Sequence, residues 1–296
     1  MRAFKLVTAR DSEHAVALLA EHGASVKVLA GGTDLLVDLK SATEVPEVVL
    51  DISRAADLKG IAVTDRGLRI GTLATHTEIM RSPLVRELCP VLVDAVHTIG
   101  AVQTRNLGTL GGNLVTCVPS MDSGPALLAL EARVTIAGAG GRRAIALAEF
   151  FVGPRKTSLA PGELLVDIVI PTANLGKPAS FLKFGLRKGQ ALALVNVAAS
   201  LWVDPARRTF AAPRIALGAV APIVIRAPQA EGYLEGRRIT PEAMAEAGRI
   251  AAGEAQPISD FRASAEYRRD LVAVLTRRAL AAACTRADAG QTGGTQ

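Results

Sequence analysis

Two glycine-rich clusters are the parts of this chain best suited to ligand chemistry. They are AGGTD at 30–34 and LGTLGGN at 107–113. Glycine lets the backbone approach a ligand closely and adopt positive φ, so that successive N–H groups can point at one anion. A helix that starts directly after the turn, as Leu35 suggests for the first cluster, adds free N–H groups of its own. The two clusters together favour binding of a diphosphate.

Each cluster taken singly is more typical of a tight structural turn than of a ligand site. Neither matches the G-x-G-x-x-G pattern of Rossmann folds or the G-x-x-x-x-G-K-[ST] pattern of P-loops, so both of those sites are disfavoured. The stretch at 138–141 also fails the dinucleotide pattern, because Arg143 occupies its last position. We interpret that stretch as a hairpin turn.

Composition indicates a folded protein of two ordinary domains. Hydrophobic residues make up 49% and charged residues 21% of the 296 residues, which is enough apolar surface for buried cores. The net charge of +6 would attract an anionic partner, but Lys and Arg are dispersed and aromatic residues are only 3%. Nucleic acid binding usually needs clustered positive charge and exposed rings. A basic nucleotide- or nucleic-acid-binding module is therefore kept only as an alternative.

The cysteines and the apolar segments bear on metal binding and on location. Cys89, Cys117 and Cys284 are widely separated and form no zinc or iron–sulfur spacing, so we predict three small buried apolar residues and no metal site. An odd, sparse count is typical of a reducing compartment, which favours the cytoplasm. No signal-type segment follows Met1, and no run of about 20 apolar residues predicts a transmembrane helix.

The first half of the chain reads as alternating short helices and strands. Asp11 or Ser12 can cap a helix that Gly23 can end. Pro90 should interrupt a second, longer helical segment. We predict helices over 11–22, 35–40 and 84–99, and strands over 26–29, 48–52, 68–73, 134–137 and 164–170.

The second half reads as a small sheet covered by helices. Pro, Asn and Gly concentrate over 172–178, which predicts a boundary there. We predict strands over 181–186, 192–203 and 214–220 and helices over 241–254 and 263–284, the last with an apolar stripe at Tyr267, Leu271, Val274 and Leu275. The prediction is an α+β fold with domains at 1–175 and 176–286, followed by a mobile tail at 287–296.

Several motifs resemble, in order and over nearly the whole chain, the FAD-binding subunits of the molybdenum hydroxylase family, the xanthine dehydrogenase and carbon monoxide dehydrogenase type. No motif is specific alone, but together they are. They are LAGGTDLL at 29–36, TRNLGTLGGNL at 104–114 with PSMD at 119–122, GPRKT at 153–157 with PGELL at 161–165, FLKFGLRK at 181–188 with VNVA at 195–198, and YRR at 267–269.

The resemblance implies a fold and a function. The fold would be a two-part FAD-binding domain of the PCMH/vanillyl-alcohol-oxidase type, followed by a small domain with a three-stranded antiparallel sheet and helices. Non-covalent FAD would take electrons from a small iron–sulfur subunit and pass them to NAD, a quinone or oxygen. A large subunit would hold the molybdenum cofactor, and dimers of such heterotrimers are usual in the family. Residues 113–119 lack the cysteine-rich insertion of some members, so no extra iron–sulfur cluster is expected here.

The resemblance also implies site residues. At the pyrophosphate it implies Lys27 or Val28, then Leu29, Ala30, Gly31, Gly32, Thr33, Asp34 and Leu35, continued by Thr109, Gly111, Gly112, Asn113, Val115 and Thr116. Asp122 would accept hydrogen bonds from a sugar or ribityl hydroxyl. Leu165 and Lys183 would lie beside the isoalloxazine, where a cation favours the reduced, anionic flavin. His76 lies in a segment that approaches FAD in the family.

Alternatives stay open for several of these residues and for the whole chain. Asp122 could instead cap a helix around Pro125, Lys183 could be a solvated strand residue, and His76 could be structural. His14, His22 and His97 lie in expected helices without ligand spacing, and we assign no catalytic residue. A self-sufficient flavin oxidase of the same superfamily is the other enzymatic hypothesis, although the part after Lys177 is small for a substrate domain.

Overall fold

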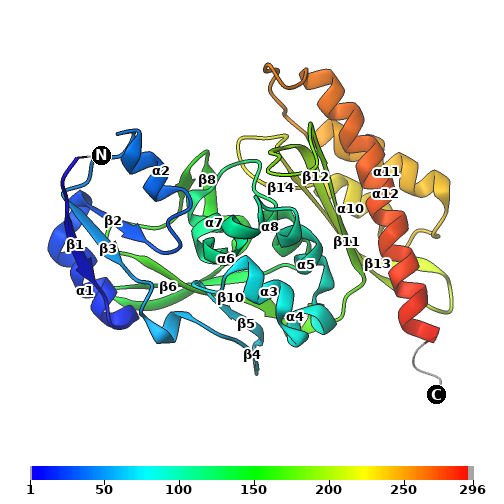
Figure 1. The fold of residues 1–296 in the computed structure, drawn as a ribbon. Helices are drawn as coiled ribbons and strands as arrows, with labels where there is room; N and C mark the ends of the chain where they lie inside the picture. Colours follow the sequence, from blue (N-terminus) through cyan, green and yellow to red (C-terminus); the bar gives the residue numbers. More distant parts are fainter. Residues whose placement is uncertain (1, 293–296) are drawn as a thin grey trace.

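The computed structural model describes residues 2–292 and has two halves, with the N-terminal half on the left of Figure 1 and the C-terminal half on the right. The chain starts with a small parallel sheet of order β1-β3-β2, formed by β1 (Lys5–Thr8), β2 (Val26–Leu29) and β3 (Val48–Asp51). Helix α1 (Ser12–His22) connects the first two strands. As predicted, the Asp11 side chain caps it and Gly23, at φ +58°, ends it. The short helix α2 (Leu35–Lys40) follows the first glycine cluster.

A five-stranded antiparallel sheet of order β4-β5-β10-β6-β7 forms the floor of the N-terminal half. Its strands are β4 (Ile61–Thr64), β5 (Gly67–Gly71), β6 (Arg133–Gly138), β7 (Gly141–Ala146) and β10 (Leu164–Pro171). Strand β10 runs through the middle of this sheet, and its residues 164–170 are all buried, including Asp167, which pairs with Arg69. Gly138 pairs with Gly141 across the tip of the β6–β7 hairpin, which confirms the predicted turn.

Short helices pack between this sheet and the C-terminal half (Figure 1). They are α3 (His76–Arg81), α4 (Pro83–Leu88), α5 (Pro90–His97), α6 (Val102–Leu107), α7 (Leu110–Thr116), α8 (Ser123–Ala129) and α9 (Leu147–Phe150), and the hairpin β8 (Phe151–Gly153) with β9 (Lys156–Thr157) follows. The predicted break at Pro90 is confirmed, since it separates α4 from α5. The second glycine cluster differs from a simple turn, because most of it forms α7.

The C-terminal half is an antiparallel sheet of order β11-β12-β13-β14 covered on its outer face by α12 and α10, with α11 packed against both helices (Figure 1). Its elements are β11 (Ala179–Gly185), β12 (Ala193–Asp204), β13 (Thr209–Gly218), β14 (Ile225–Arg226), α10 (Pro228–Leu234), α11 (Pro241–Glu254) and α12 (Ala265–Thr292). The expected three-stranded sheet is wrong by one strand, because two-residue β14 pairs with β13. Such a short strand leaves no alternating pattern to detect.

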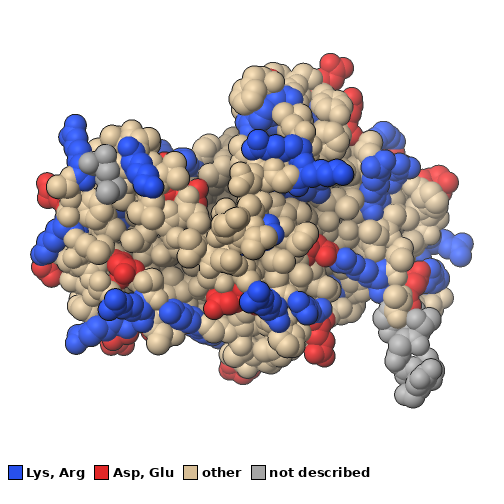
Figure 2. Space-filling model, in the orientation of Figure 1, with Lys and Arg blue, Asp and Glu red and all other residues tan. Residues whose placement is uncertain are grey.

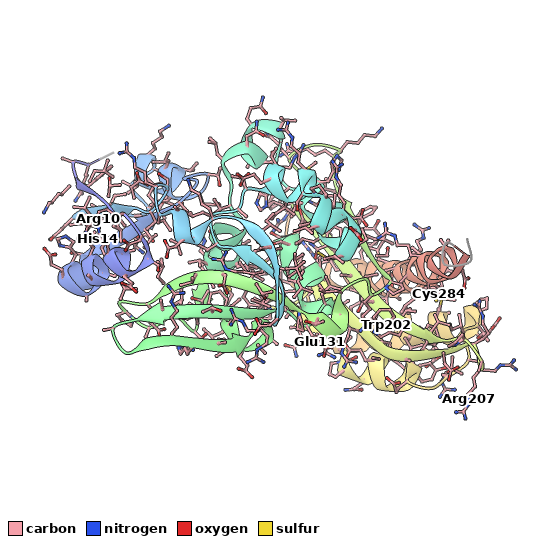
Figure 3. All side chains as sticks on the ribbon, turned by 90° about the horizontal axis from the view of Figure 1, so that it is seen from below. Arg10, His14, Glu131, Trp202, Arg207 and Cys284 are labelled. Atoms are coloured by element: carbon pink, nitrogen blue, oxygen red, sulfur yellow. The ribbon has the colours of Figure 1, made fainter. Side chains whose placement is uncertain are left out.

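Helix α12 is longer than the predicted helix at 263–284, and its residues 287–292 correct the prediction of a mobile tail there. Packing extends it, since Ala287 is 6% exposed and Arg208 pairs with Asp288 at 2.6 Å. The rest of the predicted mobile tail, 293–296, lies outside the described residues. Cys284 lies on this helix (Figure 3), and all three cysteines are buried and free, as expected.

Strand β12 joins the two halves because it is buried on both faces. Val195, Val197 and Ala199 point into the core under α11 and α12. Ala198, one residue out of phase, packs into the core of the N-terminal half. At the far edge of this junction Glu131, labelled in Figure 3, accepts from Arg214 Nε at 2.8 Å. The C-terminal sheet is therefore a wall against which the N-terminal helices pack.

Candidate functional site

The two glycine clusters line one cavity of about 340 Å³ in the N-terminal half. Of the residues singled out from the sequence, its wall includes Val28, Ala30, Gly31, Gly32, Thr33, Asp34, Leu35, His76, Thr109, Gly111, Gly112, Asn113, Val115, Thr116 and Leu165. Leu29, Asp122 and Lys183 are not part of this wall. A cleft shared by both clusters is what a common ligand requires.

The two loops touch each other at Gly31. A Cβ placed there would lie 1.9 Å from the carbonyl oxygen of Leu107, so only glycine permits this approach. Gly32 is needed for another reason, since its φ of +72° disfavours L side chains. The Leu29 side chain packs beneath Gly32, which makes Leu29 a support of the loop and not part of the cavity wall. The two neighbouring glycines are thus required for different reasons: close approach at Gly31 and a positive φ at Gly32.

The first loop presents free backbone donors to the cavity. Within residues 2–292, the N–H groups of residues 31–34 donate to no protein atom. The carbonyls of Gly32 and Asp34 are used to start α2, accepting from Leu36 and Asp38. A run of successive unpaired amides on a turn is an anion-binding concavity. The first loop therefore fits a phosphate group.

The second loop uses its amides within the protein. Amides 110–113 all have acceptors: the carbonyls of Ala74 and Thr72 at 2.9 Å each, Thr109 Oγ1 at 3.1 Å and the Thr109 carbonyl at 3.0 Å. Gly111 permits this docking, because a Cβ there would lie 1.7 Å from Thr72 Oγ1. The second loop therefore offers fewer amides than the first: among the N–H groups of residues 108–113, only that of Thr109, which lines the cavity, has no acceptor in the described chain.

Besides the Thr109 N–H, the second loop can still offer side chains. Asn113 Oδ1 accepts from the Ser123 hydroxyl at 2.6 Å, which orients the amide. Asn113 Nδ2 has no acceptor among residues 2–292 and remains available to a ligand. Thr116 is less available, since its hydroxyl donates to the Gly112 carbonyl at 2.8 Å.

His76 closes the cavity against the second loop. Its backbone N–H donates to the Gly108 carbonyl at 3.0 Å, and its side chain is 2% exposed. Burial, with a smaller contribution from the nearby Arg105 charge, lowers the pKa of His76 to about 4. Nδ1 is buried and has no partner in the described chain. A neutral imidazole with an unused nitrogen fits a polar ligand better than it fits an apolar core.

Asp122 and Lys183 form an ion pair that links the two halves. Lys183 Nζ lies 2.5 Å from Asp122 Oδ2 and 3.2 Å from the Thr98 carbonyl. Asp122 precedes α8, but its side chain makes no capping bond, so the alternative of a helix cap is wrong. Lys183 is not a solvated strand residue either, since its side chain is 9% exposed. Burial raises the pKa of Asp122, and the Lys183 charge opposes that rise.

This pair lies at the end of the cavity that contains Gly100. Lys183 lines a second, basic cavity of about 680 Å³, which shares Gly100 with the first. Leu165, only 2% exposed, lines the first cavity alone. Leu165 and Lys183 were expected on one ligand group, yet they line different parts of the cleft.

Sequence reasoning missed several wall residues. They are Ile52, Thr72, Ile99, Gly100, Thr104, Gly108, Leu159, Glu163 and Leu164. Gly100 carried a signal, because a glycine directly after a predicted helix, here 84–99, is typical of a left-handed position, and its φ is +52°. Thr104, Gly108, Glu163 and Leu164 lie within the motifs quoted above but were not singled out as site residues. The remaining four reach the cavity through tertiary folding. Among the described residues no group of His, Cys, Asp or Glu could hold a metal ion, and no helix is long and apolar enough to cross a membrane.

Comparisons with known proteins agree with this geometry. Residues 2–173 match the family "FAD binding domain in molybdopterin dehydrogenase", and residues 180–283 match "CO dehydrogenase flavoprotein C-terminal domain". The chain is 32% identical to the carbon monoxide dehydrogenase medium chain of Hydrogenophaga pseudoflava, over 92% of this chain and 94% of that one. It is 35% identical to the nicotine 6-hydroxylase medium subunit of Paenarthrobacter nicotinovorans, over 88% and 90%.

Solved structures show the same fold over nearly the whole chain. Carbon monoxide dehydrogenase from H. pseudoflava superposes with a TM-score of 0.92 at 32% identity, covering 96% of this chain and 98% of that one. Quinoline 2-oxidoreductase from Pseudomonas putida 86 superposes with a TM-score of 0.89 at 28% identity, covering 97% and 98%. With both family matches spanning nearly the whole chain, this protein belongs to the FAD-binding medium subunits of the molybdenum hydroxylase family, as an oxidoreductase subunit that carries the family's FAD-binding domain.

Proposed function

We propose that this chain holds one non-covalent FAD in the cavity between the glycine loops, with the diphosphate on the amides of residues 31–34. The proposal rests on the four successive unpaired N–H groups, because a run of free amides on one turn forms a concavity that binds an anion such as a phosphate. Val28, Ala30 and Leu35 flank that position, and Asn113, whose Nδ2 has no acceptor in the described chain, lines the same cavity from the second loop. Val115 and Thr116 extend the same wall.

At the other end of the cleft, the residues suit the redox-active ring. FAD supplies electron exchange in one- or two-electron steps. The Lys183 ammonium, fixed by Asp122, provides positive charge that favours a reduced, anionic ring. His76 stays neutral near pH 7, so it can donate or accept a hydrogen bond without adding charge. We assign Asp122 primarily to holding Lys183, and a hydrogen bond from a ligand hydroxyl to its carboxylate would require the ligand to reach past the present cavity wall.

For the whole assembly, we propose that this subunit passes electrons from iron–sulfur clusters on a small partner to an external acceptor: NAD, a quinone or oxygen. A large partner with the molybdenum cofactor would oxidise the substrate, in a dimer of heterotrimers. Support comes from relatives named medium chain or medium subunit, such as those of carbon monoxide dehydrogenase and nicotine 6-hydroxylase. Three free, buried thiols are consistent with work in the cytoplasm.

Spectroscopy of the isolated chain tests the proposal. The purified protein should show the visible bands of oxidised flavin, and denaturation should release all of the chromophore into the supernatant. Colour that stays with the denatured polypeptide would instead support the covalent flavin oxidase. A colourless protein that FAD cannot reconstitute would refute the cofactor assignment. Substrate hydroxylation by the isolated chain would refute the division of labour.

Salt-sensitive binding of nucleic acid is not expected. Figure 2 shows Lys and Arg scattered over the visible face and interspersed with acidic residues, not gathered into one stripe. A test with duplex and single-stranded oligonucleotides should therefore show no binding at physiological salt, in contrast to the basic binding module considered from composition.

A further inference from the structure

Asn196 is a fully buried polar residue that the proposed function does not use. It lies on β12, directly opposite Lys183 of β11 and Gly218 of β13, so that the three form a row across the sheet. It is 0% exposed. Its Nδ2 donates both of its hydrogens, to Asp122 Oδ1 at 2.7 Å and to the Met121 carbonyl at 3.1 Å.

The orientation of the Asn196 amide is fixed by its acceptors. The opposite orientation would place Oδ1 against a carboxylate and a carbonyl, which is repulsive. In the present orientation Oδ1 is buried without a partner. A Cβ at Gly218 would lie 2.0 Å from that oxygen, so glycine opposite Asn196 makes room for it. A buried, unsatisfied oxygen is costly and calls for a compensating role of the other end of the amide.

We propose that Asn196 is a positioning residue: it orients the Asp122 carboxylate so that Oδ2 holds the Lys183 ammonium at the edge of the FAD cleft. The inference rests on the proposed function for the identity of the ligand. Asp122 divides its two oxygens between Asn196 and Lys183, and neither oxygen alone would fix its rotation. The Thr98 carbonyl then holds Lys183 from the other side, at 3.2 Å.

The same strand supplies a matched control. Ser200 lies four residues along β12, so it points to the same face as Asn196. It is also 0% exposed, and its hydroxyl donates to the Ala129 carbonyl at 2.6 Å, at the other end of α8. Ser200→Ala therefore removes a buried hydrogen bond across the same junction without touching the Asp122–Lys183 pair.

The main experiment compares Asn196→Leu with Ser200→Ala in the purified chain. Asn196→Leu should weaken FAD binding about tenfold, since charge-assisted hydrogen bonds are worth about 1.5–3 kcal/mol and 1.4 kcal/mol is tenfold in affinity. The midpoint potential of bound flavin should fall, because Lys183 is no longer held where it favours the reduced form. Ser200→Ala should lower the melting temperature alone.

A purely structural role would move only the melting temperature. Asn196→Leu with the affinity and the potential of the wild type would therefore overturn the proposal. Gly218→Ala offers an independent perturbation that keeps Asn196 itself. It should displace the amide and reproduce both flavin effects, and a variant that folds and binds FAD as the wild type does would count against the proposal.

A readout without flavin separates this inference from the proposed function. Acetic anhydride should acetylate Lys183 of the apo wild type slowly relative to the exposed Lys59, as quantified by mass spectrometry of peptides. In Asn196→Leu the Lys183 rate should rise about tenfold relative to Lys59, because the ammonium loses its fixed carboxylate. If the wild type binds no FAD, the proposed function fails, yet this ratio still decides whether Asn196 holds Lys183. An unchanged ratio would contradict the inference.

Discussion

The two glycine loops share composition but differ in what their backbone amides do. In the first loop, amides 31–34 are free, and their residues line the cavity. In the second, amides 110–113 are all taken up by acceptors of the protein. Glycine permits close approach in both loops, toward a ligand in one and toward neighbouring backbone and side chains in the other. The account of hydrogen bonds, and not the glycine count, identifies the anion-binding loop.

Gly31→Ala should break the contact between the loops and have the largest effect. The new Cβ would meet the Leu107 carbonyl at 1.9 Å, and the backbone cannot move aside as a flexible side chain would. We expect FAD affinity to fall by roughly 100-fold, with a lower melting temperature. Fluorescence titration measures the affinity. Gly140→Ala, in open space outside the cavity, should change neither property, whereas wild-type affinity in Gly31→Ala would show that the loops need not touch.

Acid should lower the free energy of unfolding, because His76 is buried in neutral form against the second loop. Burial lowers the His76 pKa from 6.5 to about 4, so an unfolded chain takes up a proton at a pH where the folded one does not. The stability contributed by the neutral imidazole is complete above pH 6.5 and is lost progressively as the pH falls toward about 4. We expect a loss of about 2 kcal/mol at pH 5.

Thermal unfolding between pH 7.5 and pH 5 measures this dependence. His76→Gln should flatten the profile because it removes the titrating group, while His14→Gln, on the outer helix α1 (Figure 3), should leave it as in the wild type. Equal slopes for the wild type and His76→Gln would contradict the assignment.

Gly32→Ala should distort the first loop without a backbone clash. Alanine at φ +72° costs roughly 1–2 kcal/mol. Because the strain falls on the free amides, we expect FAD binding to weaken about tenfold. Gly162→Ala is the matched control, since Gly162 has φ +84°, has open space around it and does not line the cavity. Gly162→Ala should lose a similar free energy of unfolding but keep its FAD affinity. If both variants lost affinity equally, the loss would reflect general destabilisation and not the free amides of the first loop.

Asn113→Leu should show what the second loop contributes through side chains. It removes the free Nδ2 donor, and one hydrogen bond of about 1 kcal/mol corresponds to about fivefold in affinity. Ser123→Ala removes only the partner of Oδ1 and should change affinity less than about twofold. Calorimetric titration with FAD distinguishes the two. If Asn113→Leu binds FAD as tightly as the wild type, the Asn113 side chain donates no hydrogen bond to the ligand.

Local patterns determined much of this protein by themselves. Asp11 and Gly23 mark the ends of α1, Pro90 separates two helices, and the glycines at 138–141 form a hairpin, because capping, proline and turn chemistry act between near neighbours. The order of the motifs sufficed to indicate the family, which the matches over 2–173 and 180–283 confirm. Short strands such as β1 and β14 have too few residues to show an alternating apolar pattern, and neither was predicted from the sequence.

Tertiary structure alone decided which groups remain free to bind. Sequence spacing could not show that Thr72 and Ala74 take up the amides of the second loop, or that Asn196 and Lys183 share Asp122 from neighbouring strands. Asp122 lies 74 positions from Asn196 in the chain, and a hydrogen bond at that separation depends on how sheets and helices pack. Residue types specify what a group can donate or accept, and the fold determines which partners have already been supplied.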